Sequence, residues 1–130
     1  MRIIGHGVDL VEIARIGAML ERHPDRFPER VFTAQERCDA MPQRRRVEHL
    51  AGRFAAKEGV LKALGTGLTQ GIAWTDVEVV RDGAGKPLVR LHGAAAAQAA
   101  LQGVREILLS ISHTKTHAIA SAIAVGDGGA

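Results

Sequence analysis

The sequence predicts a single α+β domain in which an antiparallel sheet packs against one long helix. Three observations support this class. Apolar stretches of strand type occur near both ends of the chain, a long helical stretch lies between them, and a glycine-rich turn joins two short strands near the middle. The 130 residues suit one compact domain, which we place at 1–125, with a disordered tail at 126–130.

The first third of the chain predicts a strand followed by two helices. Residues 3–11 are apolar with two glycines and predict a strand. Apolar residues then recur at helical spacing over 13–20, and His23-Pro24-Asp25 ends that helix. Residues 33–36 have the pattern of a capping box, which predicts a short helix that stops before Pro42.

A long helix is predicted over residues 44–64, and Gly65 can adopt the left-handed conformation that ends helices. At about 100° per residue, one face of this helix carries an apolar cluster of Val47, Leu50, Ala51, Phe54, Leu61 and Gly65. Glu58 projects onto the same face, where a carboxylate is costly unless a cation, a donor or a metal compensates it.

The second half of the chain is dominated by strands. Residues 74–81 alternate and predict a strand, residues 82–87 form a turn, and residues 88–91 return as the partner strand. An alanine-rich helix is expected over 94–101. Two further strands are expected on either side of residues 113–117, at 107–112 and 119–125.

Composition narrows the classes of function. The net charge of +3 and the pI near 9.6 favour an acidic ligand or partner. Aromatic residues make up only 3% of the chain, which disfavours single-stranded nucleic-acid binding. The single cysteine, Cys38, to which we assign no role, excludes an internal disulfide and fits a reducing cytoplasm. We expect no membrane span and no signal peptide.

Asp9 is the second informative acid, because it lies between apolar neighbours on the first predicted strand. Two carboxylates from separate elements, Asp9 and Glu58, are typical of Mg²⁺ sites that are completed by water and substrate phosphate. The alternative is that Asp9 caps the following helix and that Glu58 pairs with Lys62 one turn on. The pattern alone leaves both interpretations open.

Basic residues suggest where an anion could bind. Arg53, Lys57 and Lys62 follow Arg44-Arg45-Arg46 on the long helix, and they either hold phosphates or form a solvated basic face. The turn 65–67 could present backbone N–H groups to a phosphate, although it lacks the spacing of a P-loop.

His113 follows an apolar strand and is flanked by Ser112 and Thr114, so it either binds a phosphate, moves a proton or simply bonds to the backbone. A Ser-His-Asp hydrolase is excluded because the Gly-x-Ser-x-Gly motif is missing. A zinc site is disfavoured because there is no Cys pair and no His-Glu-x-x-His motif, and a helix-turn-helix DNA binder fits poorly because strands dominate the second half of the chain.

Taken together, these residues resemble the holo-acyl-carrier-protein synthase family of small phosphopantetheinyl transferases. Three blocks carry the resemblance, at residues 7–16, 50–67 and 110–125, with weaker support from 76–79 and 85–87. Their order and spacing match over nearly the whole chain. The resemblance implies the phosphopantetheinyl transferase fold and transfer of the phosphopantetheine arm of coenzyme A onto a serine of apo-acyl carrier protein, in fatty acid biosynthesis.

The resemblance also implies roles for individual residues. Asp9 and Glu58 would hold Mg²⁺, Lys62 would offset charge on the pyrophosphate, and either Glu58 or a water held by Asp9 would accept the serine proton. Nucleotide phosphates would be bound by a larger set of residues, namely Arg53, Lys62, Gly65, Thr66, His113 and Thr114. Lys86 and Pro87 would approach the adenine.

For the carrier protein, the resemblance implies contact with Arg15, Met19, Arg26 and Phe27. It further implies a homotrimer with sites between subunits. Two alternatives remain from other classes: a basic nucleic-acid-binding module, and a trimeric binding module that has lost the chemistry. The acids argue against the first, because a nucleic-acid binder has no use for Glu58 on an apolar stripe.

Overall fold

The computed structural model describes residues 1–41 and 43–127, and it confirms the α+β class. In chain order the strands and helices are β1 Arg2–Glu12, α1 Ile13–Arg22, α2 Arg26–Val31, α3 Ala34–Asp39, α4 Arg46–Leu64, β2 Val77–Arg81, β3 Pro87–Leu91, α5 Gly93–Leu101, β4 Val104–His113 and β5 His117–Gly126. Short 3₁₀ helices precede α4 at Gln43–Arg45 and β2 at Trp74–Asp76.

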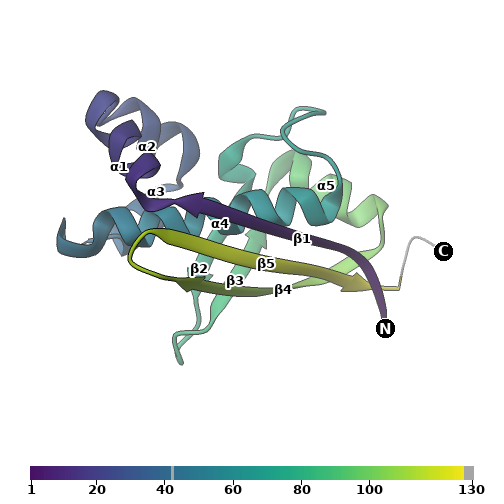
Figure 1. The fold of residues 1–130 in the computed structure, drawn as a ribbon. Coiled ribbons are helices and arrows are strands. Elements are labelled where there is room, and N and C mark those ends of the chain that lie inside the picture. Colours follow the sequence, from purple (N-terminus) through teal and green to yellow (C-terminus); the bar gives the residue numbers. More distant parts are fainter. Residues whose placement is uncertain (42, 128–130) are drawn as a thin grey trace.

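Two antiparallel sheets are present, and the larger one packs along the length of α4 (Figure 1). Its strand order is β1-β5-β4, while β2 and β3 form a separate hairpin. Helices α1 and α2 lie at one end of α4 and α5 at the other (Figure 1). No helix in the described residues is long and apolar enough to cross a membrane.

Small side chains let the sheet approach α4 closely. The residues of β5 that face α4 are all alanines and are almost fully buried: Ala118, Ala120, Ala122 and Ala124. On β1, a Cβ added at Gly5 would lie 1.9 Å from the carbonyl oxygen of Ala63, and one added at Gly7 would lie 2.0 Å from that of Gly59. Only glycine therefore fits at these two contacts, which fix β1 and Asp9 against the helix.

The local signals identified in the sequence are confirmed. The backbone N–H of Thr33 donates to Glu36 Oε1 at 2.9 Å, and Thr33 Oγ1 accepts from the Glu36 N–H at 3.2 Å, which completes the capping box. Gly65 adopts φ +73° and ends α4. The central hairpin pairs Arg81 with Pro87.

Some element boundaries differ from the predictions. Residues 74–76 form a 3₁₀ turn rather than the start of a strand, and α2 was not predicted. Both C-terminal strands are longer than expected. Gly126, placed in the predicted tail, ends β5, and the Asp127 carboxylate lies 2.7 Å from Arg105 Nε. Residues 128–130 and Pro42 lie outside the described residues.

Burial of α4 extends well beyond the single apolar face expected from the sequence. The helix is buried on most sides, because the sheet, α3 and β2 surround it. Phe54, Glu58 and Lys62, which follow one another at four-residue spacing, form its least buried stripe, so Glu58 lies at the edge of the core rather than within it.

Lys57 was grouped with the phosphate-binding candidates, but the structure gives it a different role. Its side chain is fully buried, and its ammonium lies 2.7 Å from Glu36 Oε1. It also donates to the carbonyls of Trp74 and Val77. Burial lowers the pKa of Lys57, and the Glu36 carboxylate opposes that shift. This buried ion pair joins α3, α4 and β2 behind the site.

Candidate active site

Asp9, Glu58 and Lys62 meet where β1 crosses α4. Lys62 Nζ donates to Asp9 Oδ1 at 3.1 Å and to the carbonyl oxygen of Val8 at 3.0 Å. The Asp9 side chain is largely buried and the Lys62 side chain is about half exposed, at 16% and 53%. The lysine can therefore reach a ligand from the position in which it holds Asp9.

The Glu58 carboxylate interacts electrostatically with Asp9. Burial, followed by the negative charge of Asp9, raises the pKa of Glu58. Lys62 and then Arg15 oppose this shift. Burial and the Asp9 charge both disfavour the ionised form of Glu58. A carboxylate in such a setting is suited to binding a cation or to transferring a proton.

The two interpretations of these acids can now be compared. Asp9 does not cap a helix, because Glu12 is the N-cap of α1 and makes no side-chain cap bond. The cation paired with Asp9 is Lys62, which was the expected partner of Glu58.

The same two acids fit a metal that is completed by its substrate. No group of three or more acidic, His or Cys ligands occurs among residues 1–41 and 43–127. Two neighbouring carboxylates nevertheless match Mg²⁺, which commonly takes one or two protein carboxylates and fills its remaining positions with water and phosphate oxygens.

The turn after α4 acts as a helix stop. The N–H of Gly65 donates to the Lys62 carbonyl at 3.0 Å, and that of Thr66 donates to the Leu61 carbonyl at 3.2 Å. These two N–H groups are therefore not free to cradle a phosphate, and phosphate binding by the rest of the turn 65–67 stays a prediction. The Thr66 hydroxyl donates to the Gly67 carbonyl at 3.1 Å.

Arg53 and His113 line one cavity of about 200 Å³ between α4 and β4. The Arg53 side chain is almost fully buried, at 2% exposure, so the solvated basic face was the wrong interpretation for this residue. His113 ends β4 and is exposed, with Nδ1 3.2 Å from the Thr114 carbonyl oxygen. The Thr114 hydroxyl accepts from the N–H groups of Thr116 and His117 and so shapes the turn after β4.

Sequence reasoning missed two other residues of this cavity, His49 and Arg81, whereas Arg45, which also lines it, belongs to the basic triplet named from the sequence. His49 lies four residues before Arg53, so helical spacing could have placed it beside that arginine. Arg81 could not have been found in this way, because only the tertiary fold brings the end of β2 to this side of α4.

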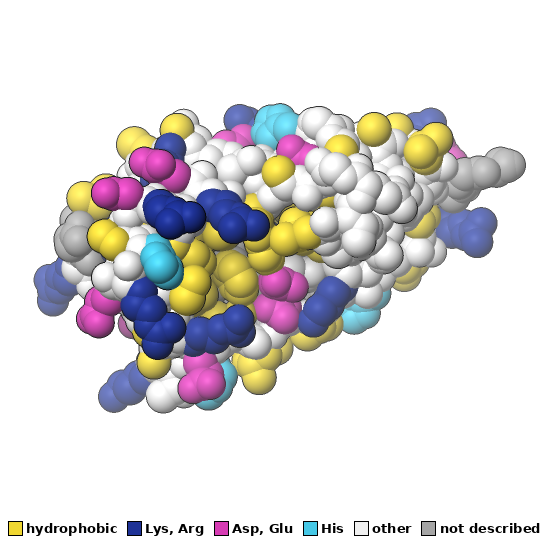
Figure 2. Space-filling model, turned by 90° about the horizontal axis from the view of Figure 1, so that it is seen from above, with side chains coloured by type: hydrophobic (Ala, Val, Ile, Leu, Met, Phe, Trp, Pro, Cys, Tyr) yellow, Lys and Arg dark blue, Asp and Glu magenta, His cyan; other side chains and the backbone are white. Residues whose placement is uncertain are grey.

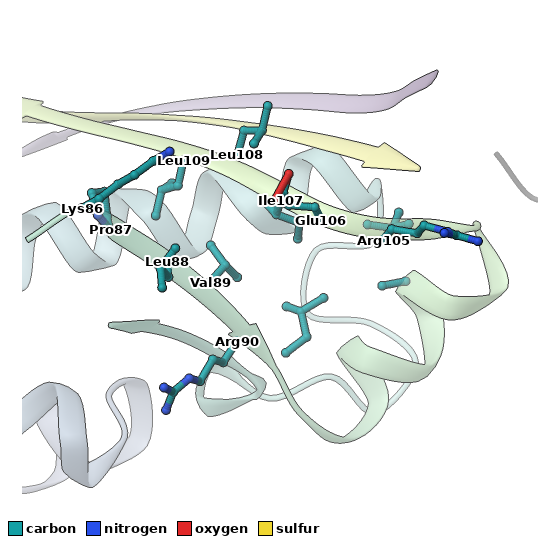
Figure 3. A pocket seen from close by; sticks show the side chains of 13 residues that line it. Lys86, Pro87, Leu88, Val89, Arg90, Arg105, Glu106, Ile107, Leu108 and Leu109 are labelled. Atoms are coloured by element: carbon teal, nitrogen blue, oxygen red, sulfur yellow. The ribbon is translucent and has the colours of Figure 1, made fainter. Parts of the chain in front are cut away.

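Lys86 and Pro87 line a different hollow, a groove of about 570 Å³ between β3 and β4 (Figure 3). Both residues lie at one end of the groove, and Arg105 lies at the other. The floor is largely apolar and includes Val89 and Ile107. Lys86 and Pro87 therefore lie beside an apolar surface of the kind that a planar base can contact.

The predicted docking residues lie together on α1 and α2. Met19, Arg26 and Phe27 line a hollow of about 520 Å³. Figure 2 shows a hydrophobic hollow with Lys and Arg side chains on its rim and acidic side chains beside it. Arg15 is exposed on α1 and close enough to Glu58 to affect its pKa.

Phe27 differs from its prediction as a surface residue. It is buried, at 9% exposure, and packs against Phe32 and Phe54 at ring centroid distances of 6.0 and 6.5 Å. Its main role is therefore to hold α2 on the core, and it offers a partner only the edge that lines the hollow.

Comparison with known proteins agrees with this geometry. Residues 5–121 match the 4'-phosphopantetheinyl transferase superfamily (ACPS). A holo-[acyl-carrier-protein] synthase of Alkaliphilus metalliredigens is 47% identical over 122 residues, which cover 94% of this chain and 98% of that protein.

Solved structures show the same fold. The holo-[acyl-carrier-protein] synthase of Neisseria meningitidis superimposes with a TM-score of 0.88 at 30% identity, covering 95% of this chain and 99% of that one. That of Bacillus anthracis, solved in complex with CoA (3',5'-ADP), gives 0.79 at 36% identity and covers 96% and 98%.

The chain therefore belongs to the 4'-phosphopantetheinyl transferase superfamily. Within it, the similarity to holo-[acyl-carrier-protein] synthases over nearly the full length shows that the chain is a phosphopantetheinyl transferase enzyme of that type.

Proposed function

We propose that the protein transfers the 4'-phosphopantetheine arm of coenzyme A to a serine of apo-acyl carrier protein, releasing adenosine 3',5'-bisphosphate. The observation that carries the proposal is the meeting of Asp9, Glu58 and Lys62 where β1 crosses α4. The carrier protein would serve fatty acid biosynthesis, and the reaction would be cytoplasmic, as the lone Cys38 suggests.

The reaction exchanges one phosphorus–oxygen bond for another. The serine oxygen attacks the phosphorus that bears the pantetheine arm, and the bond from that phosphorus to the bridging oxygen of the pyrophosphate breaks. The bridging oxygen leaves with adenosine 3',5'-bisphosphate, and the serine proton passes to a base. Positioning and charge stabilisation supply most of the catalysis in reactions of this kind.

The residues present divide these tasks. Lys62 lies beside the pyrophosphate in this proposal and offsets the charge that grows on the leaving oxygen. Glu58 is suited to accept the serine proton, because its raised pKa brings it nearer to the working pH than an ordinary carboxylate. Asp9 and Glu58 would hold Mg²⁺, which when bound supplies further positive charge to the phosphate oxygens.

The proposed carrier-protein surface is the hollow on α1 and α2. Its lining includes three cationic or ionisable basic side chains, His23, Arg26 and Arg30, beside Met19. Arg15, on the same helix as Met19, is close enough to Glu58 to lower the pKa of that carboxyl. An acidic carrier protein docked here would bring its serine toward the carboxylates, with the charged rim guiding its approach.

A homotrimer with sites between subunits would account for the separation of Arg53 from Lys62 around α4 and for the exposed apolar side chains on the outer face of the sheet. Arg53 lies about 180° around α4 from Lys62 at 100° per residue, so the phosphate-binding cavity and the carboxylates face different sides of the chain. The outer face of the β1-β5-β4 sheet exposes Val8, Leu10, Leu108 and Ile119. A second copy on this face would cover these side chains and could unite one chain's carboxylates with its neighbour's cavity.

A nucleic-acid-binding module gains no support from the structure. The aromatic side chains pack on one another: the half-buried Phe54 stacks on the half-buried Trp74 at 5.1 Å and also contacts the buried Phe27. These rings are therefore not arranged as an exposed platform for bases.

The test is intact-mass measurement of an apo-acyl carrier protein incubated with the protein, coenzyme A and Mg²⁺. We expect the mass of the carrier protein to increase by one phosphopantetheine arm, and we expect no increase when a chelator is present. Glu58→Gln should stay folded and transfer nothing. The proposal would be refuted if the protein is folded and binds coenzyme A but increases the mass of none of several carrier proteins.

A further inference from the structure

The last turn of α4 is held against the rest of the fold at two points. The first is β1, where a Cβ added at Gly5 or Gly7 would clash with the backbone of the helix. The second is the side chain of Gln102, whose Nε2 donates to the Leu64 carbonyl at 2.7 Å across 38 positions of the sequence. The final carbonyls of a helix have no partner within it, so a donor from elsewhere has to satisfy them.

The Gln102 amide is presented from a firmly held backbone. Gln102 is the C-cap of α5, and its N–H donates to the carbonyls of Gln98 and Ala99, both at 3.2 Å. Gly103 follows with φ +77° and leads the chain into β4. A Cβ added at Gly126 on β5 would lie 2.0 Å from the Gly103 carbonyl oxygen, so β5 packs directly on this turn. The amide therefore reaches α4 from a platform that has little freedom to move.

The segment that follows α4, residues 65–71, has few other anchors. In the described part of the chain, its N–H and hydroxyl groups donate only to carbonyls at the end of α4 or within the segment itself. A Cβ added at any of its three glycines would meet no atom within 4 Å, so the segment is also loosely packed. The contact between Gln102 and Leu64 is therefore the hydrogen bond that ties the start of this segment to another element.

The residues on either side of this contact belong to the candidate site. Lys62, two residues before Leu64, donates to Asp9 Oδ1 at 3.1 Å. Thr66, two residues after Leu64, is a residue for which the family resemblance implies contact with a phosphate. If the Leu64 peptide shifted, both side chains would change position, because the last turn of α4 would no longer be fixed relative to α5.

We propose that Gln102 is a positioning residue, which holds the end of α4 and the turn after it in the arrangement that binds the phosphates of the substrate. The inference rests on the proposed function, in which Lys62 lies beside the pyrophosphate of coenzyme A. Gln102 acts through the Leu64 carbonyl. That carbonyl carries the partial negative charge of a helix C-terminus, so only a side chain that donates can replace the amide.

The test is the Kd of coenzyme A, measured by titration calorimetry on the full-length protein. Gln102→Met keeps the length of the side chain and removes the donor. We expect it to weaken binding by roughly three- to tenfold, the range of one neutral hydrogen bond. Gln102→Glu, which when ionised can only accept, should weaken binding at least as much. Gln102→Lys, whose ammonium can donate to the same carbonyl, should recover most of the affinity.

Gln98→Met is the matched control. Gln98 is half-buried on the same helix, and its side chain makes no hydrogen bond in the described residues. This variant removes the same amide from α5 without touching α4, so its affinity for coenzyme A should equal that of the wild type.

Steady-state rates separate positioning from a general loss of structure. Gln102→Met should raise the KM of coenzyme A and leave the KM of the carrier protein unchanged, because the docking surface on α1 and α2 lies at the other end of α4 (Figure 1). A rise in both values would overturn the proposal.

Urea unfolding supplies the remaining comparison. Lower stability of Gln102→Met with an unchanged Kd would show a merely structural contact and would also overturn the proposal. If Gln102→Met does not fold, Gln102→Glu takes its place, and Gln102→Lys must still bind more tightly than Gln102→Glu. Calorimetry needs no carrier protein, so a wild-type protein that binds coenzyme A but transfers no arm would refute the proposed function separately.

Discussion

Gly7→Ala tests how β1 is held against α4. The added Cβ would lie 2.0 Å from the Gly59 carbonyl oxygen, 2.7 Å from the Ala63 nitrogen and 2.8 Å from the Lys62 Cβ. Two of these neighbours are backbone atoms of α4, which cannot rotate away. The strand must therefore move, and Asp9, two residues along, must move with it.

The size of the effect follows from the geometry. Ordinary contact begins at 3.4 Å, so β1 must retreat by roughly 1.4 Å, the difference between 3.4 Å and 2.0 Å. Overpacking of this kind costs about 1–3 kcal/mol of unfolding free energy. A displacement of about 1 Å at a reacting group can reduce the rate by roughly 100-fold. We expect both losses in Gly7→Ala.

Gly59→Ala is the matched control at the same contact. Its added Cβ meets no atom closer than 3.4 Å, and alanine is preferred to glycine within a helix by about 1 kcal/mol. This variant should be as stable as the wild type or more so, with the arm still transferred.

Urea unfolding gives the free energies, and intact-mass measurement of the carrier protein gives initial rates. A Gly7→Ala protein with wild-type stability and rate would refute the steric argument. Lost stability with an unchanged rate would show that this contact does not position Asp9.

Three further predictions address the buried network and the docking surface. Lys57→Met leaves Glu36 buried without its cation and should cost about 3–5 kcal/mol in urea unfolding; a loss below about 1 kcal/mol would contradict the role of this pair. Arg15→Glu should weaken carrier-protein affinity by roughly tenfold or more, most strongly at low salt, while coenzyme A binding stays normal, and equal loss of both would indicate misfolding instead. The Thr33 hydroxyl, more than His92, lowers the pKa of Glu78. Because the folded pKa lies below the unfolded one, Glu78 contributes stability above about pH 5 that is lost as the pH falls through the folded pKa. The stability deficit of Glu78→Gln should accordingly shrink in acid, and a deficit that is constant from neutral to acid pH would exclude this linkage.

Local features of the fold could be predicted from the sequence because they depend on neighbouring residues. The capping box at Thr33 and Glu36, the left-handed Gly65 and the turn between β2 and β3 each arise from a few adjacent side chains. The same holds for the residue types of the site, since an acid within an apolar strand and a second acid on a helix already indicate chemistry.

Residue exposure could not be predicted in the same way. Arg53, Lys57 and Lys62 lie on one helix and look alike in the sequence, yet Lys57 is fully buried, Arg53 is 2% exposed and the Lys62 side chain is 53% exposed. Lys57 is buried because Glu36 arrives from α3 and two carbonyls from the segment that leads into β2. Arg53 is buried and lines the same cavity as Arg81. Lys62 remains exposed to solvent while it donates to Asp9.

The sequence by itself determined the α+β class, the ends of several elements and the resemblance that points to phosphopantetheinyl transfer. Only the tertiary structure decided which basic residue is structural, which one is buried without a partner in the described residues, and which one is exposed beside Asp9. The physical reason is that desolvation and ion pairing depend on groups from distant parts of the chain. The periodicity of a single helix does not predict which of these groups will pack against a given residue.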